Sequence, residues 1–133
     1  MLNLPKGSPS LQPLFNNTQS QGAYVEQLVE TYLHTHRFQS LFKNFRCRLG
    51  EIDLIGLHED QLIFLEVRFR RNTLFGGATA SIDRRKQQKL RLTAQFFLRK
   101  YPNYAEKACR FDVAAVTLSR GKYVIDWITN AFC

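Results

Sequence analysis

Two short segments decide how this chain folds: Gly50-Glu51-Ile52-Asp53-Leu54-Ile55 and, a few residues later, Phe64-Leu65-Glu66-Val67-Arg68. Each places acids among apolar residues that favour β-strands. The polar stretch His58-Glu59-Asp60-Gln61 lies between them and predicts a hairpin turn centred between Glu59 and Asp60. In that register Asp53 lies directly opposite Glu66, with the two Cβ atoms about 5 Å apart on the same face.

This pair of facing acids predicts a metal site. Two carboxylates held so close repel each other and destabilise a sheet unless a positive charge lies between them. A hard divalent cation such as Mg²⁺ takes carboxylate oxygens of this kind. Two other interpretations stay open: a hairpin that carries its acids on a solvated face, and a register that slips by one residue.

The composition indicates one globular domain with a polyanionic partner. The chain has 133 residues, of which 44% are hydrophobic, enough for one packed core but short for two domains. Its 19 Lys and Arg against 11 Asp and Glu give a net charge of +8, which favours nucleic acid or an anionic surface. No apolar run approaches the roughly 20 residues of a membrane span, and the N-terminus lacks the pattern of a secretory signal.

The cysteines and histidines show no ligand spacing. The three cysteines are odd in number and scattered, at Cys47, Cys109 and Cys133. This argues against a zinc site or a disulfide framework and indicates a reducing, cytoplasmic location. We expect the three histidines on the surface: His34, His36 and His58.

The chain divides into a short extension and one domain. Residues 1–21 contain three prolines and no acid, and we expect them to form a flexible extension. Residues 22–133 are expected to form a single domain, an α/β mixed sheet flanked by helices in the order αβββαββ. Residues 70–80 lack periodicity, which predicts a mobile loop. The expected helices span 22–36 and 82–100, and the expected strands span 38–47, 51–57, 62–69, 110–118 and 122–128.

Three charged side chains are placed to join the acidic pair. Arg68 follows Glu66 by two residues and points to the same side of the strand, where it either contacts a phosphate or pairs with Glu51. Lys86 lies on the inward stripe of the second helix, from which it either reaches the acids or extends along the edge of the core. Glu26 borders the apolar stripe of the first helix, so it either completes a metal shell or is an ordinary flanking charge.

The middle of the chain is strongly basic. Between Arg68 and Lys100 there are ten Lys or Arg residues and one acid, Asp83. Contacts from Lys and Arg to phosphates give an affinity that does not depend on sequence and that salt weakens. The residues that we expect to bind nucleic acid are Arg70, Arg71, Arg84, Arg85 and Lys89.

Asp112 interrupts an apolar strand near its start. An acid in such a strand needs a partner when it is buried. We therefore expect a structural role for Asp112, paired with Arg110 or with another basic side chain.

Taken together, these segments resemble the YraN family, a widespread bacterial group regarded as distant kin of archaeal Holliday junction resolvases. The likeness covers about residues 22–133. It implies a restriction-endonuclease-like fold and the PD-(D/E)xK nuclease constellation. The segments that carry it are residues 50–55 and 64–68, Lys86, Arg110-Phe111-Asp112-Val113 and Asn130-Ala131-Phe132.

The resemblance also implies roles for the site residues. Asp53 and Glu66 would be the metal-binding acids, Glu26 the helical acid, and the main-chain carbonyl of Val67 a further ligand to Mg²⁺ or Mn²⁺. Arg68 occupies the position of the motif's lysine, where arginine keeps the charge but resists deprotonation. Either Lys86 supplies the missing function from the neighbouring helix, or cleavage is weak or lost.

Two functions follow as expectations. The first is a Mg²⁺- or Mn²⁺-dependent DNA endonuclease that acts on structured or branched DNA, with Asp53, Glu66, Arg68 and Lys86 as its catalytic residues. Resolvases of this kind act as dimers, so a second copy of the chain is an expected partner. The alternative is a nucleic-acid-binding module of the same fold that is catalytically weak or inactive. A protein–protein adaptor with an incidental positive face is a third reading.

Overall fold

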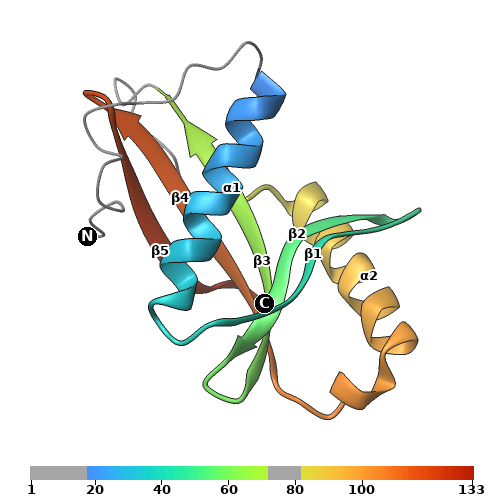
Figure 1. The fold of residues 1–133 in the computed structure, drawn as a ribbon. Helices are drawn as coiled ribbons and strands as arrows, with labels where there is room; N and C mark the ends of the chain where they lie inside the picture. The colour runs from blue at the N-terminus through green and yellow to red at the C-terminus, as the bar shows by residue number, and fades with distance from the viewer. Residues whose placement is uncertain (1–17, 72–81) are drawn as a thin grey trace.

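The fold is a five-stranded mixed sheet with one helix on each face (Figure 1). The computed structural model describes residues 18–71 and 82–133, so most of the expected extension and most of the expected loop lie outside the described residues. The elements follow the predicted order αβββαββ, which confirms the fold class. They are α1 (Thr18–His34), β1 (Gln39–Cys47), β2 (Gly50–His58), β3 (Gln61–Arg70), α2 (Arg84–Lys100), the short 3₁₀ helix η1 (Pro102–Tyr104), β4 (Cys109–Ser119) and β5 (Lys122–Phe132).

Two boundaries differ from the expectation by more than two residues. Helix α1 begins at Thr18 and not at Gly22, and its first turn includes the buried Gln21, which accepts a hydrogen bond from Arg71, the residue after β3. Strand β5 runs on to Phe132, whose ring stacks on that of Phe111 with the centroids 4.8 Å apart. In both cases the element is longer than its local sequence pattern predicts, and the added residues make a tertiary contact.

The strands lie in the order β1-β2-β3-β4-β5. Neighbouring strands are antiparallel except for β3 and β4, which are parallel and are joined through α2. Leu57 pairs with Leu62, as predicted from a turn centred between Glu59 and Asp60. Both turn residues have positive φ, 52° and 66°, the conformation of the two-residue turns that match the twist of a hairpin.

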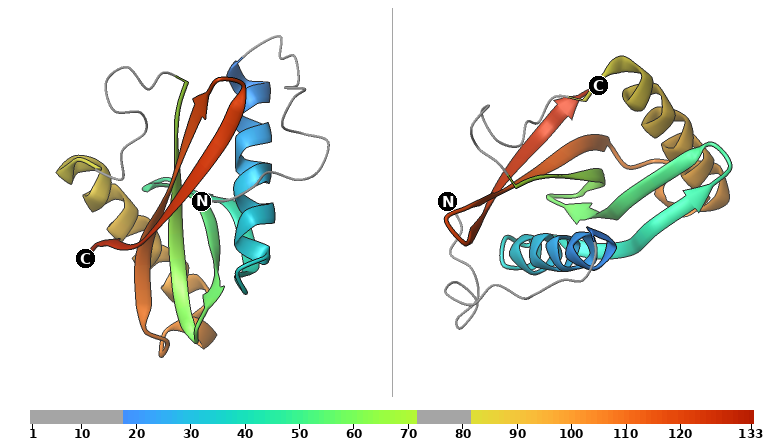
Figure 2. Two further views of the ribbon diagram at one scale, coloured as in Figure 1. Left: turned by 90° about the vertical axis from the view of Figure 1, so that its left-hand side faces the viewer. Right: turned by 90° about the horizontal axis from the view of Figure 1, so that it is seen from above.

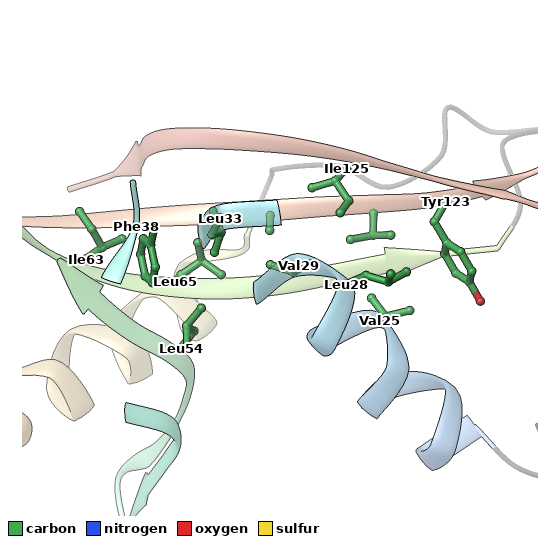
Figure 3. Close-up of a cluster of buried hydrophobic side chains, with 12 residues drawn as sticks. Val25, Leu28, Val29, Leu33, Phe38, Leu54, Ile63, Leu65, Tyr123 and Ile125 are labelled. Atoms are coloured by element: carbon green, nitrogen blue, oxygen red, sulfur yellow. The ribbon is translucent and has the colours of Figure 1, made fainter. Parts of the chain in front are cut away.

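The two helices cover opposite faces of the sheet (Figure 2). Helix α1 packs on one face through Val25, Val29 and Leu33, all of which are almost fully buried (Figure 3). Helix α2 packs on the other face through a stripe that includes Leu90 and Phe97. Among the described residues, neither helix has the length and apolar character needed to cross a membrane.

The start and the packing of α2 have clear local causes. The helix starts after Asp83, whose side chain accepts a hydrogen bond of 2.8 Å from the main-chain N–H of Lys86. It ends at Lys100, two residues before Pro102, which cannot continue a helix. In its middle it approaches the β1–β2 turn so closely that a Cβ at Gly50 would lie 2.8 Å from Oγ1 of Thr93. Glycine at position 50 therefore lets the β1–β2 hairpin rest directly on α2.

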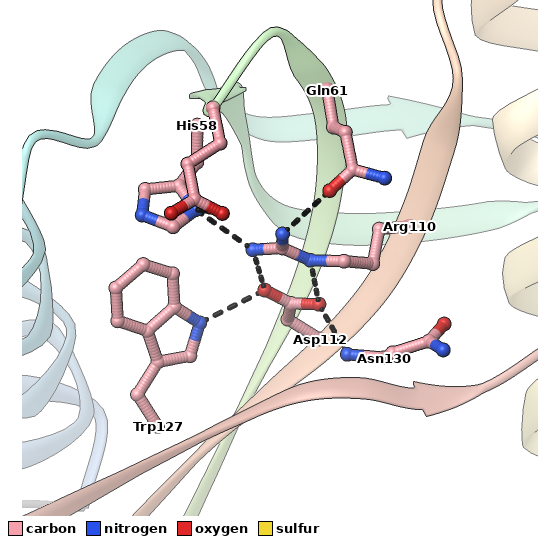
Figure 4. Close-up of polar contacts among 7 residues, drawn as sticks. His58, Gln61, Arg110, Asp112, Trp127 and Asn130 are labelled. Carbon is pink, nitrogen blue, oxygen red and sulfur yellow. Dashed lines mark hydrogen bonds and ion pairs between the residues drawn. The ribbon is translucent and has the colours of Figure 1, made fainter.

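A buried polar network joins the far end of the hairpin to β4 and β5 (Figure 4). Arg110 donates two hydrogen bonds to Asp112, at 2.9 and 2.8 Å, which confirms the predicted structural pairing. Asp112 also accepts from Nε1 of Trp127 at 2.9 Å and from the main-chain N–H of Asn130 at 2.8 Å. Arg110 reaches on to Gln61 at 2.8 Å.

The surface position expected for His58 is wrong. Only 13% of its side chain is exposed, since Nδ1 lies 3.1 Å from Nη2 of Arg110 and the ring packs against Trp127 with the centroids 4.7 Å apart. Residues from β4 and β5 thus cover the end of β2. His34 and His36 are exposed, as expected.

Candidate functional site

The site begins where β2 and β3 separate. The paired positions of these strands run from His58 and Gln61 to Leu54 and Leu65 and stop there. At the next position the Asp53 side chain replaces the main chain, because its Oδ2 accepts a hydrogen bond of 2.8 Å from the N–H of Val67. Beyond this point β3 continues along β4, while β2 continues along β1. The two acids predicted to face each other therefore lie at a split in the sheet.

Glu66 stands in this split and has a basic partner. Its side chain is 10% exposed, and Oε2 lies 3.1 Å from Nζ of Lys86 on α2. The structure thus brings Asp53, Glu66 and Lys86 together, from two neighbouring strands and the helix that crosses between β3 and β4. The site therefore holds one ammonium group, that of Lys86, for the two carboxyl groups of Asp53 and Glu66.

The acids are short of positive charge, and their pKa values reflect it. Burial, then the nearby charge of Asp53, raises the pKa of Glu66 to about 7, although Lys86 acts in the opposite direction. Burial also raises the pKa of Asp53, against the opposing effects of the Val67 N–H and of a hydrogen bond with Glu66. The two carboxyl groups are thus close enough to share a proton. The pair therefore carries negative charge that Lys86 alone does not offset.

Glu26 approaches Asp53 from the face of the sheet that α1 covers. It lines a cavity of about 250 Å³ between α1 and the strands, together with Asp53 and Val67. Burial, then the charge of Asp53, raises the pKa of Glu26. Glu66 is not among the residues that line this cavity. Glu26 thus faces Asp53 across open space, on the side away from Lys86.

The donors suit a hard divalent cation that keeps part of its water. Within residues 18–71 and 82–133, no three His, Cys, Asp or Glu side chains lie close enough together to form a complete metal cage. The direct ligands would be Asp53 and Glu66, with the main-chain carbonyl of Val67, and Glu26 would act through water in the cavity. Mg²⁺ is commonly bound in this way, by one or two carboxylates with several waters retained.

The predicted alternative for Arg68, a salt bridge with Glu51, does not form. That pairing required the β2–β3 register to continue past Asp53, but β2 has separated from β3 there. Glu51 instead pairs with Arg46 of β1, at 3.3 Å. Arg68 lies opposite Ala115 of β4 and makes no ion pair within the described part of the chain.

The five predicted nucleic-acid contacts fall into two groups. Arg84, Arg85 and Lys89 are exposed on α2, the helix that carries Lys86, and α2 contains no acid. Arg70 is exposed at the end of β3, and Arg71 is held toward α1 by Gln21. The structure therefore gathers three of the five on the helix beside the acids.

Sequence reasoning missed two residues of the cavity wall. Asn44 of β1 hydrogen-bonds to Glu26, and Lys43 pairs with Glu30 of α1 at 3.0 Å. Asn44 has a φ of 53°, which turns the strand locally. An asparagine within a strand-forming run was the available signal, because asparagine is otherwise disfavoured in strands.

The architecture and the site define a class of protein: a mixed α/β sheet with an acidic pair and a lysine at a split between strands. Within that class, the pattern of the family described as "Uncharacterised protein family UPF0102" matches residues 25–116. The chain belongs to this family, the YraN family that its motifs resemble.

Relatives from other bacteria match over most of their length. A UPF0102 protein from Stutzerimonas stutzeri is 44% identical over 117 residues, which cover 88% of this chain and 98% of that protein. One from Aeromonas hydrophila is 44% identical over 122 residues, which cover 91% of each chain. One from Pseudomonas paraeruginosa is 42% identical over 118 residues, which cover 87% of this chain and 94% of that protein.

Proposed function

We propose that this protein is a Mg²⁺- or Mn²⁺-dependent endonuclease that acts on structured or branched DNA. One observation carries the proposal: Asp53, Glu66 and Lys86 lie together at the split in the sheet, with Lys86 on the acid-free helix α2. Two acids beside one lysine supply ligands for a cation and a charge for a phosphate. A phosphodiester needs both, since negative charge grows on its oxygens as it is cleaved.

Each residue of the candidate site has a defined role in this proposal. Asp53 and Glu66 hold the cation, with the Asp53 carboxylate fixed in place by the Val67 N–H. Lys86 neutralises charge on the scissile phosphate and aligns the attacking water, a role that suits its flexible ammonium group. Arg68, on the same strand as Glu66, binds a neighbouring phosphate oxygen.

The reaction is a hydrolysis. The oxygen of a water molecule forms a bond to phosphorus, and the bond from phosphorus to one bridging sugar oxygen breaks. One proton of that water ends on the departing oxygen, which leaves a phosphomonoester and a hydroxyl group. A bound Mg²⁺ or Mn²⁺ would polarise the phosphodiester and lower the pKa of the water.

Two further points concern the compartment in which the protein works and the number of copies that act together. Its three cysteines are free, which suits a reducing compartment, and we place the activity in the cytoplasm. A symmetric junction has two strands to cut, so we propose that two copies act on one branched substrate.

The second candidate is a nucleic-acid-binding module without turnover. It is favoured by Arg68, since an arginine in place of the motif's lysine cannot donate a proton readily. In that case the basic face of α2 would still bind DNA, with an affinity that falls steeply as salt rises.

A cleavage assay separates the two. The protein and its Asp53→Ala variant are incubated with single-stranded, duplex, forked and four-way-junction DNA, in Mg²⁺, in Mn²⁺ or in EDTA. The nuclease predicts cleavage that needs a metal and Asp53, while DNA affinity changes less than about 3-fold, because the basic surface is intact. Equal binding without cleavage by either protein supports the binding module. Cleavage retained by Asp53→Ala rejects the assigned site.

A further inference from the structure

The turn between β1 and β2 carries an exposed leucine. Among the residues that the structure describes, Leu49 is the one exposed large apolar residue, with 37% of its surface accessible to solvent. It belongs to the two-residue turn Arg48-Leu49, between Cys47 and Gly50. Figure 1 shows this hairpin extending away from the rest of the sheet, with the turn at its end.

Nothing in turn formation explains this residue. Two-residue turns favour Gly, Asn, Asp, Pro and Ser, and Arg48-Leu49 contains none of them. Leu49 therefore leaves about a third of its surface in water, where that part contributes nothing to the core. The side chain is thus available for a partner.

The surroundings of Leu49 are basic. Arg48 precedes it in the turn. Arg46, two residues before Arg48 on β1, is exposed and also pairs with Glu51 at 3.3 Å. On the other side, Gly50 rests against α2, within reach of the main chain of Lys89. The hairpin tip therefore lies beside the basic helix, with Arg48 in the turn itself and Lys89 on the helix next to it.

We infer that Leu49 is a wedge that inserts between stacked bases at a branch point of DNA, while Arg46, Arg48 and Lys89 bind the flanking phosphates. Apolar side chains flanked by basic residues act in this way, since bases offer apolar faces and the backbone offers negative charge. The inference rests on the DNA binding of the proposed function but not on cleavage. It gives a reason for a preference for branched DNA, where the bases at the branch are already partly unstacked.

The strand also sets a distance. Leu49, in the turn just before β2, lies four residues before Asp53, which corresponds to about 13 Å along an extended chain. With a rise of about 3.4 Å per base pair, this equals roughly four base-pair steps. For a duplex that runs along β2, the phosphate cut in the proposed function would lie about four nucleotides from the unstacked step.

Fluorescence of 2-aminopurine at the branch of a forked duplex tests the wedge directly, because unstacking raises its emission. The full chain is titrated onto the fork in EDTA, so that no cleavage occurs. We expect a rise in emission with the natural protein and with Leu49→Met, and a rise at least 3-fold smaller with Leu49→Asn. The Kd of Leu49→Asn should stay within about 3-fold of that of the natural protein. The variant loses the contacts of the leucine side chain, but it also avoids the free-energy cost of unstacking the bases.

Two variants serve as controls. Arg48→Gln should weaken binding several-fold, yet at saturation it should produce the full emission. Val124→Asn, a change of a half-buried apolar residue on β5, should alter neither quantity once the thermal melt shows the folded state.

Each outcome has a separate meaning. Equal emission from Leu49→Asn and the natural protein overturns the wedge, as does binding with no emission change in either, which would leave Leu49 to contact a protein partner. Cleavage is measured in parallel with Mn²⁺. Unstacking without cleavage rejects the nuclease and keeps the wedge, while cleavage without unstacking rejects the wedge alone.

Discussion

The main-chain N–H of Val67 donates to Oδ2 of Asp53 at 2.8 Å. Asp53 lies one residue beyond the last paired position of β2, and Val67 lies two residues beyond the last paired position of β3. A side chain thus takes over a hydrogen bond that a main-chain carbonyl would otherwise accept. This arrangement holds the carboxylate at the split and keeps the buried N–H satisfied. It gives Asp53 a structural task that can be measured separately from any catalytic one.

The first prediction separates these tasks. Asp53→Asn keeps an oxygen that can accept from Val67, while Asp53→Leu leaves that N–H without a partner. We expect Asp53→Leu to be less stable than Asp53→Asn by about 1–2 kcal/mol, the cost of an unsatisfied buried donor. Urea unfolding in EDTA measures the difference, and the Val67 amide should exchange at least 10-fold faster in Asp53→Leu. Equal stability and equal exchange would show that the hydrogen bond is unimportant.

The second prediction concerns pH and the metal-free protein. Burial, then Asp53, raises the pKa of Glu66 from its ordinary 4.5 to about 7, so the folded state binds this proton more tightly than the unfolded state. The stabilising contribution is therefore complete below about pH 4.5, declines up to about pH 7 and is lost above it.

Glu66→Gln removes this dependence, because glutamine resembles the protonated acid. Relative to the natural protein, the variant should gain about 2 kcal/mol of stability between pH 5 and pH 8. The measurement is urea unfolding at both pH values in EDTA. A difference between the two proteins that does not change with pH would show that Glu66 has an ordinary pKa.

The third prediction compares two lysines one helical turn apart. Lys86 contacts Glu66 at 3.1 Å, whereas Lys89 is exposed on the same helix. Lys86→Met should reduce cleavage at saturating DNA by about 100-fold or more, and binding by less than 3-fold. Lys89→Met should leave saturated cleavage within 3-fold, while the slope of log K against log salt falls by about one. Identical effects of the two changes would contradict a special role for Lys86.

The fourth prediction concerns the buried network of Figure 4. Asp112→Asn leaves Arg110, only 8% exposed, without its charged partner. We expect a loss of about 3–5 kcal/mol in the free energy of unfolding. Asp126→Asn is the matched control, since Asp126 is exposed on β5 and its change should stay within about 0.5 kcal/mol. Equal losses from both variants would mean that the network adds no specific stability.

The hairpin was predictable because its signals are local. Alternating apolar residues and a polar break at Glu59-Asp60 set the register, and counting from that turn placed Asp53 beside Glu66. The helical period in the same way placed Lys86 on the inward stripe of α2, from which it reaches Glu66. Periodicity of this kind states where side chains lie, but it does not assign them a role.

Features that depend on distant elements escaped prediction. At the split, β2 stays paired with β1 while β3 stays paired with β4, and no local pattern records these pairings. His58 is buried by Arg110 and Trp127, which come from strands about 50 to 70 positions further along the chain. The cavity between Glu26 and Asp53 likewise depends on how α1 lies across the sheet.

The placement of the charges also bears on the order in which the chain folds. Asp53 and Glu66 belong to one short hairpin, and hairpins close within microseconds. Lys86 arrives only when α2 docks, after a longer stretch of chain has been ordered. Between these events two like charges face each other with no counter-charge, so docking of α2 relieves a repulsion as well as burying Phe97. The acids that equip the site thus oppose closure of their own hairpin, and the lysine of the helix offsets that opposition.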